Sequence, residues 1–127
     1  MRAQLAAGAR ARLEAAWSAE MAAAHRARAD GDAPREWAHL ERAHIVSQPV
    51  AGAHVRTHTA MFGAALRRRD RREIVGQVFR VVVAGPGSLT GRYPVGNTGG
   101  ANVSAFRPME IPSDLRPLLE DVQQEAS

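Results

Sequence analysis

Residues 24–49 read AHRARADGDAPREWAHLERAHIVSQP, and this stretch contains a complete turn from one helix to the next. Gly31 suits the position just after a helix, and Asp32 can cap the start of the following one. Pro49 ends that second helix, because the residue before a proline disfavours helical backbone. The stretch therefore predicts a tight helical hairpin. Its two helices are expected at residues 5–29 and 34–47.

The order of helix, short turn, helix and proline recurs once further along the chain. The turn signals at Gly31 and Arg69 are 38 residues apart, and Pro49 and Pro86 are 37 residues apart. This spacing indicates a duplicated hairpin that resembles tetratricopeptide-like repeats. The second hairpin is expected from residue 51 to a turn at 67–72, and from residue 73 to about 84.

The fourth predicted helix carries a broad apolar stripe, which favours an amphipathic helix. Its three successive valines at 81–83 are also compatible with a strand, because β-branched side chains favour extended backbone. The residues of the stripe are Ile74, Val75, Val78, Phe79 and Val82.

Beyond residue 84 the chain is dense in glycine and proline, which predicts an irregular wrap over residues 85–110. Ser113 can then cap a short C-terminal helix within residues 111–127. With residues 1–84 as a four-helix array, the 127 residues are expected to form one all-α domain. The apolar side of the last helix comprises Leu115, Leu118, Leu119 and Val122.

The amino-acid composition excludes several kinds of chemistry. The chain has no cysteine, which excludes disulfides, thiolate nucleophiles and sulfur-ligated metals. All 17 basic residues are arginine, which excludes a Schiff-base lysine and the phosphate-binding lysine of a Walker loop. The chain has 25 alanines and only 5% aromatic residues, so its helices are expected to pack closely.

Charge is unevenly distributed along the chain. Residues 1–105 carry 15 arginines and 8 acidic residues, whereas residues 106–127 carry 2 and 5, so the acidic tail is expected to fold onto a basic body. Five arginines lie in residues 67–72 without an aromatic residue for base stacking, so a solvated helix end is expected rather than a nucleic-acid site. No run of 18 apolar residues occurs, and we expect a cytoplasmic protein with no membrane partner.

Three of the five histidines are placed to converge. His44 lies on the apolar side of the second predicted helix, and His54 and His58 lie one turn apart at the start of the third. The short connection makes these helices antiparallel neighbours, so the three imidazoles can meet. Imidazole ligands without sulfur suit zinc, copper or iron, and three ligands leave one coordination position for water or substrate.

Two further residues are candidate auxiliaries of this metal site. Glu41 precedes His44 by three residues, so it can present a carboxylate on the same face as a ligand or as a catalytic acid–base group. His25 lies one turn beyond Met21 on the first helix and is a candidate fourth ligand. The alternative is that each histidine is an ordinary residue whose ring nitrogens meet nearby carbonyl or carboxylate oxygens.

The glycine-rich segment offers four polar side chains within a series of turns. They are Arg92, Tyr93, Asn97 and Thr98. The segment lacks the Gly-Lys-Ser/Thr ending of a nucleotide-binding loop. Either these residues form a lid that binds a small-molecule substrate above the metal, or Asn97 and Thr98 satisfy bare helix ends.

The three histidines together with residues 89–99, LTGRYPVGNTG, resemble a small bacterial family catalogued as a domain of unknown function. The resemblance extends over about residues 10–120. It implies a single helical domain with a shared histidine set and a shared glycine-rich motif, and it implies no reaction.

Two functions follow from these patterns. The first is a small histidine-ligated metal protein that acts as a hydrolytic or oxidative enzyme on a small molecule. The alternative is a metal-free, tetratricopeptide-like module that binds another protein. Because an array of two hairpins has few internal interfaces, a homodimer is also expected.

Overall fold

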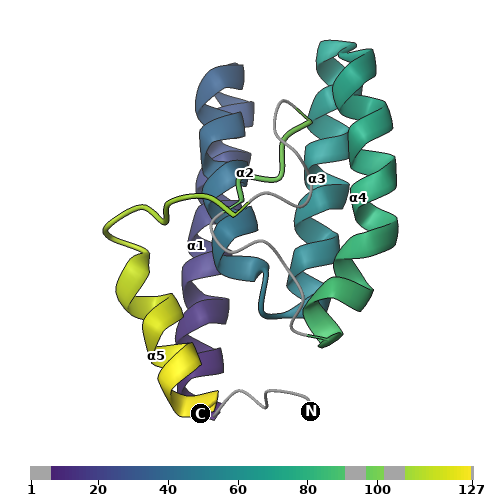
Figure 1. Cartoon of the computed structure of the whole chain (residues 1–127). Coiled ribbons are helices and arrows are strands. Elements are labelled where there is room, and N and C mark those ends of the chain that lie inside the picture. Colours follow the sequence, from purple (N-terminus) through teal and green to yellow (C-terminus); the bar gives the residue numbers. More distant parts are fainter. Residues whose placement is uncertain (1–6, 91–96, 102–107, 127) are drawn as a thin grey trace.

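The computed structural model describes residues 7–90, 97–101 and 108–126. These residues contain helices and no strand, which confirms the all-α class. Figure 1 shows α1 and α2 as one antiparallel hairpin, α3 and α4 as a second, and α5 beside α1. The helices are α1 (Ala7–Ala29), α2 (Ala33–Ser47), α3 (Ala51–Arg68), α4 (Arg71–Thr90) and α5 (Arg116–Ala126).

The first turn forms as its residues predict. Gly31 has a φ of 72°, and Asp32 caps α2 by accepting a hydrogen bond from the backbone N–H of Arg35 at 3.1 Å. Pro34 occupies the first turn of α2, where its missing N–H costs no helical hydrogen bond. Residues 48–50 alone separate α2 from α3, so the end of one helix lies beside the start of the other.

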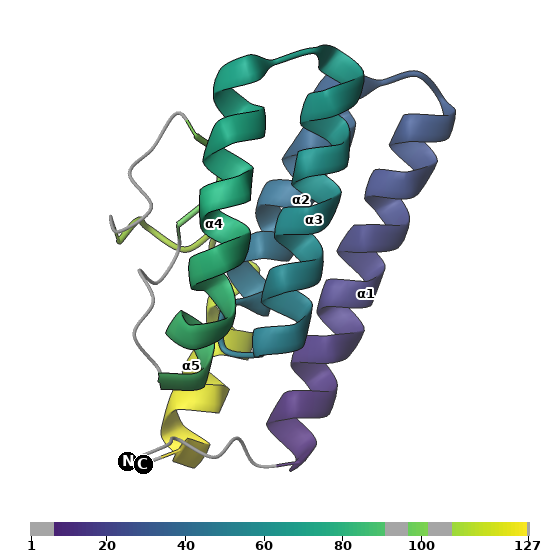
Figure 2. The same ribbon diagram turned by 90° about the vertical axis from the view of Figure 1, so that its right-hand side faces the viewer.

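Two apolar clusters hold the helices together. The first joins α1, α2 and α5, and the second joins α1, α2 and α3. Figure 2 shows the long helices side by side, with α3 between α4 and α1. The buried residues are Ala9, Leu13, Ile45, Val46, Leu115, Leu119 and Val122 in the first cluster, and Ala24, Leu40, Met61 and Ala64 in the second.

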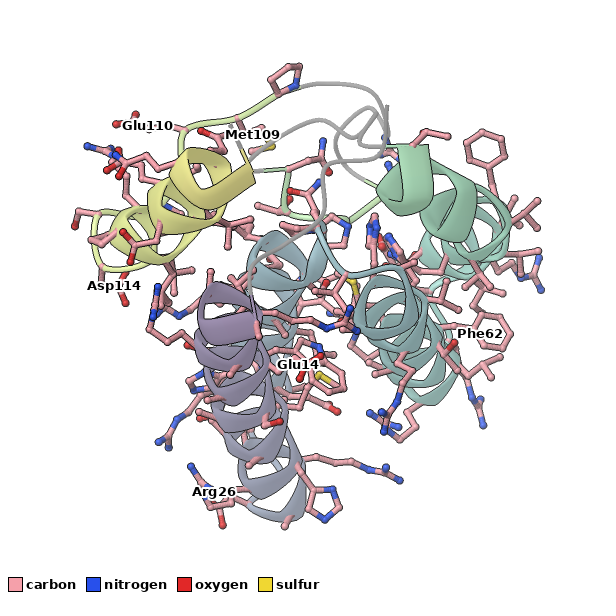
Figure 3. The ribbon with its side chains drawn as sticks, turned by 90° about the horizontal axis from the view of Figure 1, so that it is seen from below. Glu14, Arg26, Phe62, Met109, Glu110 and Asp114 are labelled. Atoms are coloured by element: carbon pink, nitrogen blue, oxygen red, sulfur yellow. The ribbon has the colours of Figure 1, made fainter. Side chains whose placement is uncertain are left out.

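The acidic C-terminal segment lies against the basic body, as its charge predicts. Arg42 forms ion pairs with Glu20 and with Asp114, and Arg12 lies 3.5 Å from Asp121. Figure 3 shows Asp114 at the side of α5. The opposite charges of the two regions therefore help to fix α5 on α1 and α2.

α4 is longer than its sequence predicts. The helix continues to Thr90 through residues 85–87, where the composition predicts an irregular segment. Each glycine disfavours helix by about 1 kcal/mol and the proline by about 3 kcal/mol, but these costs are finite, and a helix that already has several turns is extended more easily than a new one is nucleated. The prediction that Pro86 ends the helix is therefore wrong, and the strand alternative for residues 81–83 is excluded.

The end of the chain differs slightly from its prediction. α5 begins at Arg116 rather than directly after Ser113, because residues 113–115 form a turn first.

Within the described ranges, none of the helices combines the length and the apolar character needed to cross a membrane.

α4 has polar residues on its buried side and apolar residues on its exposed side. Glu73, Gln77 and Arg80 are 7%, 0% and 6% exposed. Their spacing places them on one side of the helix. The apolar stripe faces solvent instead, with Val75 71% exposed and Val82 70% exposed. Buried polar groups need partners, and Glu73 and Gln77 find them in each other, in His58 and in the backbone of residues 99–101.

Candidate metal centre

Three histidine rings lie against the buried polar side of α4. His44 comes from the last turn of α2, His54 from the first turn of α3, and His58 from the next turn of α3. All three side chains are buried. The predicted convergence of these histidines is confirmed.

The three Nε2 atoms form a small triangle. The Nε2 atom of His44 lies 3.0 Å from that of His54 and 3.0 Å from that of His58, and the His54 and His58 atoms are 3.2 Å apart. A zinc ion that binds three nitrogens tetrahedrally at about 2.0–2.1 Å separates them by about 3.3 Å. The triangle is close to that size, so the three rings fit one metal ion.

The Nδ1 atoms of two of these rings point outward and donate hydrogen bonds. Nδ1 of His44 donates to the carbonyl oxygen of Asn97 at 2.5 Å, and Nδ1 of His58 donates to Oε1 of Gln77 at 2.6 Å. The amide of Gln77 is fixed in this orientation because its Nε2 atom donates to two oxygen atoms. A neutral ring with its proton on Nδ1 carries a lone pair on Nε2. His44 and His58 therefore direct two lone pairs at each other.

Glu73 and Gln77 connect the histidines to residues 97–101, which we call the strap. Nε2 of Gln77 donates to Oε1 of Glu73 at 2.7 Å and to the carbonyl oxygen of Gly99 at 2.8 Å. The carboxylate of Glu73 accepts a hydrogen bond from the backbone N–H of Ala101, at 2.8 and 2.9 Å to its two oxygens. Outer partners of this kind orient metal-binding histidines and fix which nitrogen carries the proton.

Two glycines allow the strap to lie directly on the site. Gly99 has a φ of 84°, and a Cβ atom there would lie 2.6 Å from Cδ2 and 2.7 Å from Cγ of His44. A Cβ atom on Gly76 of α4 would lie 2.6 Å from Cβ of Ala101. Glycine is therefore required at both positions by close approach, and at position 99 also by backbone conformation.

Burial keeps His44 and His58 neutral, which is the form that binds a metal. Burial is the main reason why the pKa of His58 falls to about 4, since the hydrogen bond to Gln77 opposes the shift and the positive charge of Arg80 adds to it. Burial also holds the pKa of His44 well below its ordinary value, and unfavourable interactions with His58 and His54 contribute.

We expect the metal-free protein to lose stability as the pH falls from 7 toward 4. In the unfolded chain His44 and His58 titrate near 6.5, above their pKa values in the folded state. Between these values the unfolded chain binds more protons, so the free energy of unfolding rises with pH. His58 alone accounts for about 3 kcal/mol over this range.

Urea unfolding in the presence of a chelator, at several pH values, measures this dependence. His58→Ala should flatten the pH profile, because the variant lacks one of the titrating groups. A free energy of unfolding that is constant between pH 7 and pH 5 would contradict the prediction.

The structure does not bring His25 or Glu41 into the group of ligand atoms. In the described part of the chain, the atoms that lie within 4.8 Å of one another belong to the three histidines. His25 is exposed on α1 and lines a different cavity of about 300 Å³. Glu41 is half-buried on α2, where burial and the negative charge of Glu73 raise its pKa against a hydrogen bond from Trp37.

The predicted substrate-binding residues are only partly described. Arg92 and Tyr93 lie outside the described residues. Asn97 is buried in the strap, where its carbonyl oxygen accepts from His44 and its Oδ1 accepts from the backbone N–H of Gly99 at 2.9 Å. Thr98 is half-buried beside it. These contacts make Asn97 a support of the His44 ring, and its binding of a substrate stays a prediction.

Sequence reasoning missed the polar residues of α4. Glu73, Gln77 and Arg80 are spaced i, i+4 and i+7, so they mark one polar side on a helix whose other residues are largely apolar. That spacing is the signal that could identify them. Gly99 gives no comparable signal, because its contact with His44 joins positions 55 residues apart.

The arginine cluster at residues 67–72 is partly used inside the molecule. Arg67 forms an ion pair with Glu36, and the guanidinium of Arg68 lies 4.5 Å from the centre of the Trp37 ring. Arginine at the end of α3 also complements the partial negative charge of the helix C-terminus. The contacts of Arg67 and Arg68 fit a helix end, and the absence of a nucleic-acid site stays a prediction.

Comparison with known proteins identifies a family and no activity. No curated protein and no solved structure matches the chain, so the likeness to tetratricopeptide repeats stays a prediction. A family model described as "Protein of unknown function (DUF3703)" matches residues 11–119. The match includes the three histidines and the strap, and it confirms the resemblance to an uncharacterised family. The chain therefore belongs to this family of proteins of unknown function.

Proposed function

We propose that His44, His54 and His58 together bind one transition-metal ion. The proposal rests on the Nε2 atoms of His44 and His58, which lie 3.0 Å apart and which both carry lone pairs when the Nδ1 atoms hold the ring protons. Two such lone pairs repel each other in a buried site. A cation bound to all three Nε2 atoms replaces this repulsion with attraction.

A purely structural histidine cluster would need protons between the rings. The Nδ1 protons of His44 and His58 are donated to oxygen atoms outside the triangle of Nε2 atoms. Their Nε2 atoms can therefore donate a hydrogen bond only if the rings are charged. Burial opposes that charge, because it lowers the pKa of both rings. A proton on Nε2 of His54 can serve one neighbour at a time, whereas a metal ion serves all three rings.

Three neutral nitrogen ligands fit zinc, copper or ferrous iron and leave a coordination position for water or substrate. Zinc would support hydrolysis of a small molecule, whereas copper or iron would support its oxidation. In this enzymatic form of the proposal, Glu41 supplies an acid–base group of raised pKa. The substrate-binding residues are then Arg92, Tyr93, Asn97 and Thr98.

Elemental analysis of protein purified without an affinity tag tests the metal proposal. We expect one equivalent of zinc, copper or iron per chain, and rebinding of one equivalent after the metal is removed. A variant with alanine at the three histidine positions should bind none of these ions. Absence of metal, together with an unchanged melting temperature when each ion is added, would contradict the proposal.

Two single variants test the enzymatic form of the proposal. Arg92→Ala and Asn97→Ala should lower turnover of the substrate, and Asn97→Ala should retain the metal because the acceptor for His44 is the backbone carbonyl oxygen of residue 97. Full activity in both variants would show that the glycine-rich segment is a structural wrap.

A second candidate function is protein binding through the exposed apolar side of α4. Val75, Val78, Phe79 and Val82 follow the i, i+3, i+4, i+7 spacing of a helix contact and are at least half exposed. Leu66 of α3 is also 50% exposed, and Figure 3 shows Phe62 projecting from the same helix away from α1. We propose that this face forms a homodimer, since exposed apolar patches of this kind mark interaction sites.

We expect Val78→Asp to convert a dimer into a monomer, because the variant buries a charge at the centre of the apolar face. Light scattering coupled to size-exclusion chromatography at about 100 μM measures the mass. Ala22→Asp is the matched control, since it adds the same charge to an exposed position on α1. A monomeric mass for the wild-type protein would contradict the homodimer.

A further inference from the structure

Arg80 is a buried cation beside the histidine site. It lies on α4 one turn after Gln77, and its side chain is 6% exposed. Because α3 and α4 are antiparallel and His58 contacts Gln77, the next turn of each helix brings Arg80 level with His54. A Cβ atom on Gly76 would lie 3.3 Å from Nη1 of Arg80, so the guanidinium lies back along α4.

The guanidinium of Arg80 is close enough to act electrostatically on the site. Its positive charge contributes to the low pKa of both His44 and His58. The negative charge of Glu73 acts on Arg80 in turn, against the effect of burial. Among the described residues, the buried ionic groups beside the three imidazoles are therefore the carboxylate of Glu73 and the guanidinium of Arg80, and the half-buried carboxylate of Glu41 interacts with Glu73.

The charges of Glu73 and Arg80 cancel before any metal binds, and Glu41 adds at most one negative charge. A divalent ion adds two positive charges, and its three neutral ligands compensate neither of them. Both oxygens of Glu73 already accept hydrogen bonds from the strap. Uncompensated charge in a buried site is costly, so the open coordination position favours an anion over a neutral molecule.

We propose that a small carboxylate-type anion completes the site, with one oxygen on the metal and both oxygens within reach of the Arg80 guanidinium. This inference rests on the proposed metal site. A guanidinium has five N–H donors in a planar fork, which matches the two oxygens of a carboxylate and still allows contact with protein groups. Arg80 is thus the specificity-determining residue for the anion, and the three histidines determine the metal.

Titration of the Co²⁺-loaded protein with formate tests the assignment, because the visible absorption of cobalt responds to a change of ligand. We expect Arg80→Gln to weaken formate binding by about tenfold to a hundredfold, whereas Co²⁺ affinity should stay the same or rise, because a positive charge beside the site is removed. Arg80→Lys keeps the positive charge but loses the planar fork of N–H donors, so its affinity for formate should lie between those of the wild-type protein and Arg80→Gln. Arg72→Gln removes the same charge from an exposed position and should bind formate normally.

The paired variant Glu73→Gln/Arg80→Gln is a control for the case in which Arg80→Gln misfolds. It keeps the buried site neutral, and glutamine can still accept hydrogen bonds through its amide oxygen. We expect it to fold, to bind Co²⁺ and to bind formate as weakly as Arg80→Gln. Formate affinity equal to that of the wild-type protein, or no response of the wild-type spectrum to formate, would overturn this inference and leave the metal site intact. Failure of the wild-type protein to bind Co²⁺ would overturn both.

Discussion

His58→Ala is expected to lower the affinity for Zn²⁺ by about a hundredfold or more. Loss of an outer partner already costs about 10- to 100-fold, and His58 is proposed as a direct ligand. With Zn²⁺ at about 1,000 times its dissociation constant, the metal stabilises the wild-type fold by about 4 kcal/mol, which raises the melting temperature by about 10–20 °C. The variant should lose most of this increase. Thermal melts with and without Zn²⁺ measure the effect.

His25→Ala is the matched control for this experiment. His25 is exposed on α1 and lies outside the group of three histidines. Its loss should therefore leave the Zn²⁺-induced rise in melting temperature unchanged. A variant with alanine at His58 that keeps the full increase would refute the assignment of this residue as a ligand. If His25→Ala also loses the Zn²⁺-induced rise in melting temperature, His25 is an auxiliary ligand.

Gly99→Ala is expected to destabilise the fold by about 2–4 kcal/mol. The added methyl group overlaps the His44 ring at 2.6 Å, and a φ of 84° is unfavourable for alanine. The ring is buried and has little room to move, so the strap must shift instead. Because the strap orients His44 through Asn97, affinity for Zn²⁺ should also fall by about tenfold. Urea unfolding and a Zn²⁺ titration measure the two effects.

Two other glycines separate the steric effect from the backbone effect. Gly31 also has a positive φ, at 72°, but a Cβ atom there meets nothing within 4 Å, so Gly31→Ala should cost about 1 kcal/mol. Gly52 lies in α3 with open space around it, and Gly52→Ala should be neutral or slightly stabilising. If Gly99→Ala costs no more than Gly31→Ala, the strap does not press on the His44 ring.

Local sequence signals are sufficient for most of the helical framework. The turn at Gly31 and Asp32, the start of α3 after Pro49 and the apolar side of α5 all form as predicted. Each depends on backbone preferences or side-chain spacing within a few residues. Pro86 is the exception, because the energetic cost of proline and glycine in a helix is finite and α4 continues past it.

The histidine site was accessible to sequence reasoning only in part. The spacing of His54 and His58 and the short connection to α2 are local features, and they predict the convergence with His44. The outer partners could not be predicted in the same way, since the strap meets the site through contacts between distant positions. His25 has suitable helical spacing, but it lines a different cavity, because one face of a long helix can contact more than one neighbouring helix.

The all-α class, the hairpin turns and the convergence of the three histidines can be predicted from the sequence, because they follow from short-range backbone preferences and helical periodicity. Which side of α4 is buried depends instead on contacts with distant parts of the chain. An apolar stripe ordinarily faces the core, yet Val75 and Val82 are exposed while Glu73 and Gln77 are buried. The reason is that buried polar groups are stable only when their hydrogen bonds are satisfied, and His58 with the strap satisfies them from positions that local sequence does not reveal.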